Sequence, residues 1–171
     1  MVKVRVGCSI KSLLCHQLGL SPEYLEGRIQ TILLDGRPVD DVESAIVKQG
    51  SILALSAALP GLVGATLRRG GYYAPLRSHI SHSEAASSQP IQEGMISLKL
   101  FNLPLDELGS TFLKKGIWIN GRDLADFLKR QPDAFWSRCK GATVDGKKFD
   151  LDKLAKMKWP DRHVFLRVRT C

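Results

Sequence analysis

The sequence predicts a mixed α+β protein made of two small halves that a polar linker joins. Some segments alternate apolar and polar residues, as strands do. Between them lie segments whose apolar residues recur every three or four positions, as in helices. Residues 76–91 are rich in Ser and poor in apolar anchors, which is typical of a linker. We therefore expect one domain over residues 1–75 and a basic α+β domain over residues 92–171.

The first half is expected to begin with a strand over residues 2–6, where Val alternates with Lys or Arg. Ser9 can cap a helix over residues 10–18, which carries a stripe of apolar residues. A strand over residues 29–34 then reaches Asp35-Gly36, a dipeptide that is frequent in hairpin turns.

The next part of the first half contains a short helical turn over residues 42–48 and a buried strand over residues 52–55. Residues 51–67 carry no charge, but glycine, serine and proline interrupt them, and they fall short of the roughly 20 apolar residues that a membrane span needs. We expect residues 51–67 to form this buried strand followed by a Gly-rich loop, and we expect no membrane contact.

Strand-like and helix-like patterns also alternate in the second half. The elements expected there are a strand over 96–101, a helix over 104–115, a strand over 117–119, a helix around 124–128, a turn at Asp145-Gly146, a helical stretch over 151–156 and a strand over 163–169.

A family resemblance arises from the first half. The chain has a strand, a helix and a strand that ends in Asp35-Gly36-Arg37-Pro38-Val39-Asp40, followed by Gly50-Ser51-Ile52-Leu53-Ala54-Leu55. With these features residues 1–64 resemble the ubiquitin-like β-grasp proteins of the sulfur-carrier type, such as the molybdopterin-synthase small subunit and the thiamine-biosynthesis carrier. The resemblance implies a β-grasp fold and a scaffold that is often used for docking onto other proteins.

The sequence departs from that family at its functional end. Sulfur carriers act through a Gly-Gly at the C-terminus, whereas here Leu67-Arg68-Arg69-Gly70-Gly71 continues into Tyr72-Tyr73. A carrier role would require proteolytic cleavage after Gly71. The alternative is that these glycines permit tight backbone turns, and this is the role that we expect.

The formal charge of +8 is unevenly distributed. Residues 91–171 carry 16 Lys and Arg against 10 Asp and Glu, whereas residues 1–90 carry 9 against 7. Such an excess favours nucleic acid, anionic surfaces or acidic proteins as partners. The four cysteines have no CxxC spacing and the N-terminus lacks the apolar core of a signal peptide, so we expect reduced thiols and a cytoplasmic location.

Candidate catalytic residues are sparse. Cys8, Cys15 and His16 are the densest group, but consecutive residues on a helix point about 100° apart, and the sequence offers no partners for a nucleophile or a zinc ion. Walker, GxSxG and HExxH motifs are absent from the sequence. We therefore expect a protein that is not an enzyme and that needs no cofactor or metal.

One hypothesis for nucleic-acid binding concerns the second half. Lys99 and Phe101 share one face of the strand over 96–101, and Phe165, Arg167 and Arg169 share one face of the strand over 163–169. If the two strands pair, aromatic rings and cations would line one sheet surface, as in platforms that bind single-stranded nucleic acid. The competing interpretation is that helices cover this face and bury both Phe side chains.

The leading functional hypothesis is a non-catalytic interaction module that docks on a protein partner. The β-grasp resemblance and the lack of a catalytic motif motivate it. Residues 59–66 are apolar and rich in glycine, so we expect Leu59, Leu62 and Val63 to form part of the contact surface. Single-stranded RNA or DNA binding and a carrier processed at Gly71 are the alternatives, and the sequence predicts no particular oligomeric state.

Overall fold

The chain folds into two compact units, Met1–Phe112 (unit 1) and Leu113–Cys171 (unit 2). The computed structural model describes residues 1–77, 79–82 and 90–169. The division differs from the expected one, which placed residues 92–171 together after a linker over 76–91. The reason is that β7 (Gln92–Phe101) is hydrogen-bonded into the sheet of unit 1.

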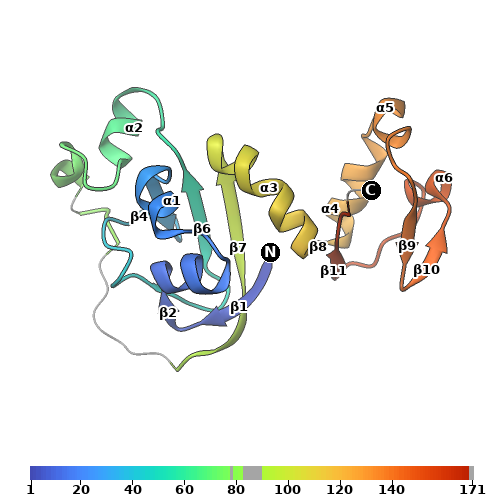
Figure 1. Ribbon diagram of the computed structural model, residues 1–171, viewed down its shortest axis with the longest axis horizontal. Coiled ribbons are helices and arrows are strands. Elements are labelled where there is room, and N and C mark those ends of the chain that lie inside the picture. The colour runs from blue at the N-terminus through green and yellow to red at the C-terminus, as the bar shows by residue number, and fades with distance from the viewer. Residues whose placement is uncertain (78, 83–89, 170–171) are drawn as a thin grey trace. The chain divides into compact units, whose positions relative to one another are not determined.

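Unit 1 is built on a mixed five-stranded sheet (Figure 1). Its strands in spatial order are β1 (Val2–Val6), β7, β6 (Ile52–Ser56), β3 (Thr31–Leu34) and β4 (Arg37–Pro38). β6 and β7 run parallel, and each of the other neighbouring pairs is antiparallel. β7, which follows the expected linker in the sequence, therefore lies between two strands of the first half.

The position of β7 follows from its side chains. Ile96 is fully buried and lies opposite Val2 of β1. Gly94 lies opposite Val4, and a Cβ at this position would come within 2.9 Å of both methyl groups of Val6. A glycine here lets β7 approach β1 closely.

Helical segments cover one face of the sheet (Figure 1). They are η1 (Ser12–Gln17) and α1 (Pro22–Gly27). η1 is a π-helix in which the Leu18 amide donates to the carbonyl of Leu13 at 3.0 Å. Ser9 Oγ accepts from the Ser12 amide at 3.2 Å, which confirms the expected cap.

The core of unit 1 lies between these helices and the sheet. Its largest fully buried side chains are Ile10, Leu13, Leu14, Leu25, Ile29, Ile32, Leu34, Leu53, Leu55, Ile96, Val6 and Val47. The expected helical turn over residues 42–48 is only partly right, because residues 42–44 form a turn and β5 (Ile46–Val47) pairs with β2 (Cys8–Ser9).

The Gly-rich loop expected after the strand in residues 51–67 is wrong, because the chain there forms helix α2 (Gly61–Leu67). Pro60 precedes the helix with an extended backbone. Gly64 packs against the chain that leads into the helix, since a Cβ at this position would overlap the carbonyl group of Leu59. The following segment forms η2 (Ala74–Arg77), which contacts α2.

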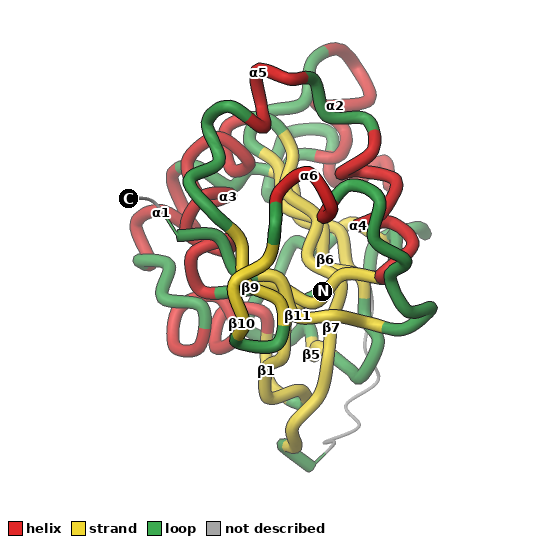
Figure 2. Tube along the Cα trace, turned by 90° about the vertical axis from the view of Figure 1, so that its right-hand side faces the viewer, coloured by secondary structure: helices red, strands yellow, loops and turns green. Residues whose placement is uncertain are grey.

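Unit 2 contains two small antiparallel strand pairs and short helices (Figures 1 and 2). The elements after α3 (Leu103–Lys115), which crosses the division between the units, are β8 (Ile117–Asn120), α4 (Gly121–Lys129), α5 (Asp133–Trp136), β9 (Ala142–Val144), β10 (Lys147–Phe149), α6 (Leu151–Leu154) and β11 (His163–Leu166). β8 pairs with β11, and β9 pairs with β10.

Local signals explain the turns and caps of unit 2. Asp145 and Gly146 adopt positive φ angles of 48° and 78° between β9 and β10, as a tight hairpin turn requires. Asn120 accepts a hydrogen bond from the Arg122 amide at the start of α4. Gly116, with a φ of 103°, lets the Phe165 ring pack directly on its backbone.

The structure thus confirms a mixed α+β fold with a mixed sheet. None of the helices formed by residues 1–77, 79–82 and 90–169 has the length and apolar composition needed to cross a bilayer.

Candidate functional site

Exposed apolar side chains gather in one segment of unit 1. Six of the large apolar side chains that are exposed among the described residues lie between residues 62 and 80, namely Leu62, Val63, Tyr72, Tyr73, Leu76 and Ile80. Leu62 and Val63 on α2 are each 70% exposed, and Leu76 on η2 is 76% exposed. Since α2 and η2 contact each other, we call the exposed side chains of these two elements, Leu62, Val63 and Leu76, the apolar surface.

A buried arginine fixes the segment that presents the apolar surface. Arg77 is 4% exposed. Its guanidinium donates two hydrogen bonds to the carboxylate of Asp40, at 2.6 and 2.9 Å, and one to the carbonyl of Thr66 at 2.6 Å. It also donates to Ser81 Oγ at 2.7 Å. One side chain therefore links the end of α2, the segment after η2 and the chain that follows β4.

A second set of contacts fastens residues 69–71 to unit 1. The Arg69 amide donates to the Gln30 carbonyl at 2.7 Å, and its guanidinium forms an ion pair with Glu26 at 2.7 Å. The Gly70 amide donates to Asp40 Oδ1 at 3.1 Å. Gly70 has a φ of 61°, so the expected role of this glycine in a tight turn is confirmed.

The contacts of residues 66–71 argue against the alternative of a sulfur carrier that is cleaved after Gly71. A processed carrier needs a tail that extends away from the fold to reach an enzyme. Residues 66–71 instead make hydrogen bonds to Gln30, Asp40 and Arg77. Release of this segment would break all of these bonds.

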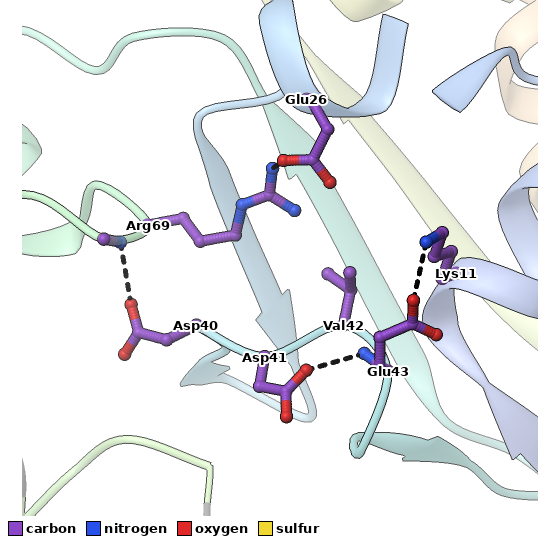
Figure 3. A pocket seen from close by; sticks show the side chains of 8 residues that line it. Lys11, Glu26, Asp40, Asp41, Val42, Glu43 and Arg69 are labelled. Carbon is purple, nitrogen blue, oxygen red and sulfur yellow. Dashed lines mark hydrogen bonds and ion pairs between the residues drawn. The ribbon is translucent and has the colours of Figure 1, made fainter. Parts of the chain in front are cut away.

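A polar hollow of about 440 Å³ lies beside the anchored segment (Figure 3). Its lining residues are Lys11, Glu26, Asp40, Asp41, Val42, Glu43, Arg69 and Gly70. The four carboxylates are engaged within the fold. Glu26 pairs with Arg69, Asp40 with Arg77, and Glu43 with Lys11, while Asp41 caps the turn by accepting from the Glu43 amide at 2.9 Å.

The electrostatics of the hollow agree with a structural role. The Glu43 amide, which hydrogen-bonds to Asp41, lowers the pKa of the Asp41 carboxyl. The hydrogen bond and charge of Glu43 raise the pKa of the Lys11 ammonium. Each group is therefore held in its charged form by a neighbour within the fold. We interpret the residues of the hollow as part of the contacts that hold residues 66–77 to the rest of unit 1, and not as a site for a ligand.

The stretch of chain that carries the apolar surface has no acidic residue. Between Glu43 and Glu84 the sequence contains no Asp or Glu but contains Lys48, Arg68, Arg69 and Arg77. Arg69 and Arg77 are paired internally. Arg68 is exposed and forms no side-chain ion pair with the residues that the structure describes.

The three residues expected at a docking surface occupy different environments. Leu62 and Val63 are exposed on α2, whereas Leu59 is half-buried and its backbone packs against Gly64. Leu76 was not expected in the apolar surface, nor were the exposed side chains of Tyr72 and Ile80 near it in the sequence. Their spacing in a polar, Pro-containing stretch gives no periodic signal, so sequence reasoning missed them.

The residues of the nucleic-acid hypothesis do not share one sheet. Lys99 and Phe101 lie on β7, which pairs with β1 and β6. Phe165 lies on β11, which pairs with β8, and Arg167 and Arg169 follow that strand. The pairing that would have joined these residues into one surface is not formed. Phe165 also packs on Trp118, with ring centroids 5.4 Å apart.

The candidate nucleophiles lie in ordinary structural positions. Cys8 is buried, and its Sγ contacts the Arg5 carbonyl and the Gln17 side chain at 3.3 Å. Burial raises the pKa of the Cys8 thiol and of the Cys15 thiol, which opposes thiolate formation. Within the described part of the chain, no group of three or more His, Cys, Asp or Glu side chains could hold a metal ion.

Comparison with known proteins identifies no similar protein. A scan against protein-family models gives no match, and searches of curated proteins and of solved structures give no significant match.

Proposed function

We propose that the protein is a non-catalytic interaction module that docks a protein partner through the apolar surface of α2 and η2. The observation that carries the proposal is the exposure of Leu62, Val63 and Leu76 on a segment that a buried arginine holds in place. An anchored apolar surface loses little conformational entropy when it binds, so more of the free energy of burial contributes to affinity.

The chemistry of the surface favours a partner with apolar side chains next to carboxylates. Full burial of Leu62 and Val63 would contribute about 1.5–3 kcal/mol each. Arg68 adds an exposed cation, and no carboxylate of the 44–83 stretch would repel an acidic partner. Charge of this kind mainly increases the association rate and excludes basic partners.

We also propose that unit 1 is a β-grasp sheet whose strands occur in a rearranged order along the chain. A helix follows β1, a tight turn joins β3 to β4, and β6 pairs in parallel with a central strand. That central strand is β7, the last strand of unit 1 in sequence order. This arrangement supports the resemblance of residues 1–64 to β-grasp proteins and supplies the strand that those residues lack.

The test is capture of a partner by the tagged full chain from its native lysate, with nuclease present in one sample and absent from a second. Leu62→Asp/Val63→Asp should lose a stoichiometric partner that the wild type retains, because two carboxylates would have to be buried at the contact. Ile91→Asp/Leu105→Asp is the matched control, since it adds the same charge to exposed apolar positions elsewhere in unit 1.

Three outcomes separate the possibilities. Loss of the partner in the α2 variant, with retention in the control and unchanged unfolding curves, supports the docking surface. Equal capture by both folded variants would exclude this surface. Wild-type protein that retains only material sensitive to nuclease would contradict protein docking as the function.

A further inference from the structure

The net charge of the protein resides entirely in unit 2. Residues 1–112 carry 10 Lys and Arg and 10 Asp and Glu, so that unit 1 is neutral. Residues 113–171 carry 15 Lys and Arg against 7 Asp and Glu, a net charge of +8. A unit of 59 residues with this excess attracts polyanions strongly at low salt.

The cations of unit 2 around α4 and α5 are available to a ligand. Arg122 forms an ion pair with Asp161. Lys129, Arg130, Arg138 and Lys140 are exposed, and their side chains form no ion pair with any residue that the structure describes. Asp133 is the only acidic residue between positions 127 and 140. This stretch therefore concentrates unpaired positive charge.

Three aromatic rings lie in the same stretch. The rings of Phe127 on α4 and Phe135 on α5 are 6.0 Å apart at an angle of 88°, and those of Phe135 and Trp136 are 5.3 Å apart at 89°. Phe127 is 48% exposed, while Phe135 and Trp136 are partly exposed. We call Phe127, Phe135 and Trp136 the aromatic cluster.

Each phenylalanine of the cluster precedes an arginine by three residues. The Arg130 amide donates to the Phe127 carbonyl, and the Arg138 amide donates to the Phe135 carbonyl, both at 3.2 Å. A turn of this kind places the side chains of residues i and i+3 on one side. An exposed arginine thus follows each phenylalanine within one turn of the chain, and the arrangement occurs twice.

We propose that unit 2 binds single-stranded nucleic acid, with bases stacking on the aromatic cluster and phosphates contacting Arg130 and Arg138. Unpaired bases offer free faces to aromatic rings, whereas the bases of a duplex are stacked on one another. The alternating rings and cations suit a chain in which bases and phosphates also alternate. This proposal concerns a different unit from the docking surface and does not depend on it.

The experiment is fluorescence anisotropy of labelled oligo-U and oligo-dT, each about 20 nucleotides long, with the full chain at about 50 and 200 mM salt. Arg130→Gln/Arg138→Gln should weaken binding about tenfold and reduce the salt slope by about 1.4, because each phosphate contact on a single strand contributes about 0.7. Phe127→Leu should weaken binding at least about fivefold at an unchanged slope, since stacking contributes about 1–3 kcal/mol per base.

The matched control is Lys153→Gln/Lys156→Gln, which removes two exposed cations of unit 2 outside the aromatic cluster. It should lower the affinity no more than about threefold, since only the general attraction falls. A second readout uses intrinsic fluorescence: oligonucleotide should quench the wild type, and Trp136→Phe should lose most of that quenching. Tighter binding of oligo-U than of oligo-dT would identify RNA as the ligand.

Several results would overturn the proposal. One is the absence of binding at about 50 mM salt, where counterion release favours association most. Another is equal weakening by the arginine and lysine double variants with no effect of Phe127→Leu, which would indicate a diffuse attraction to any polyanion. Tighter binding to duplex DNA or to anionic phospholipid vesicles than to single strands would also contradict it.

Discussion

Arg77 and Asp40 are 37 positions apart in the sequence, and their side chains form two hydrogen bonds at 2.6 and 2.9 Å. The arginine is buried, whereas the aspartate reaches the surface. A buried guanidinium requires partners for its donors, and Asp40, Thr66 and Ser81 supply them. The placement of α2 and η2 therefore depends on a residue of the β4 region.

Asp40→Asn should destabilise the protein by about 2 kcal/mol, because a buried charged donor loses its charged acceptor. The variant should also weaken partner capture, since the apolar surface would be held less firmly. Urea unfolding measures the first effect. Asp41→Asn is the control, because the side-chain oxygen of asparagine can still accept from the backbone amide of Glu43. We expect its free energy of unfolding to change by no more than about 0.5 kcal/mol. Equal stability of the two variants would contradict the role of the Arg77–Asp40 pair.

Gly64→Ala should displace α2, because the added Cβ would overlap the Leu59 carbonyl group, which is backbone and cannot move alone. We expect a loss of about 1–3 kcal/mol in the free energy of unfolding and reduced partner capture. Gly27→Ala is the control, because nothing lies within 4 Å of the added atom. Capture by Gly64→Ala at the wild-type level would show that the orientation of α2 is not needed for docking.

Residues 1–75 should not fold alone, because β7 fills the centre of the sheet in unit 1. Without it, β1 and β6 would each lose a hydrogen-bonded neighbour, and the buried Ile96 would be missing. A fragment of residues 1–115, which ends with α3, should unfold cooperatively in urea. Cooperative unfolding of the 1–75 fragment would show that the first half is independent of β7.

Signals from neighbouring residues predicted many helices, strands and turns correctly. The predictions failed where contacts between residues far apart in the sequence decide the structure. Ser9 and Asp35-Gly36 act through neighbours in the sequence, so their cap and turn were predictable. Residues 96–101 were expected as a strand, yet alternation does not specify which strands a strand pairs with. Glycine disfavours helix, so α2 was read as a loop. In the structure the helix packs through Gly64 on the backbone of Leu59, a contact that residue composition does not reveal.

For the candidate binding surfaces, too, the sequence predicted only those residues that a local pattern marks. Leu62 and Val63 were predicted because an apolar run is visible in the sequence. Arg77, which anchors that surface, lies in a stretch that reads as a linker, and its main partner is 37 positions away. The aromatic cluster was also missed, since Phe135 and Trp136 lie on a four-residue helix that was not predicted. The Phe-x-x-Arg spacing at Phe127 and Phe135 was the available signal.

The stability of the protein should fall with rising pH in a window set by Tyr24. Burial, and secondarily the Glu107 carboxylate, raises the pKa of the Tyr24 hydroxyl from 10.0 to about 12. Below about pH 10 the hydroxyl is protonated in both states and contributes no pH dependence. Between about pH 10 and 12 the unfolded state releases the proton and the folded state retains it, so the free energy of unfolding decreases with pH.

Tyr24→Phe removes this titration, and the variant should therefore lose less stability than the wild type between about pH 9.5 and 11.5. Urea unfolding at both pH values, applied to both proteins, isolates the effect, because lysine and the other tyrosines titrate in each. The free energy of unfolding falls with pH because the folded state binds the Tyr24 proton more tightly than the unfolded state does, so that raising the pH disfavours the folded state. Identical pH dependence in the two proteins would show that Tyr24 ionises equally in the folded and unfolded states.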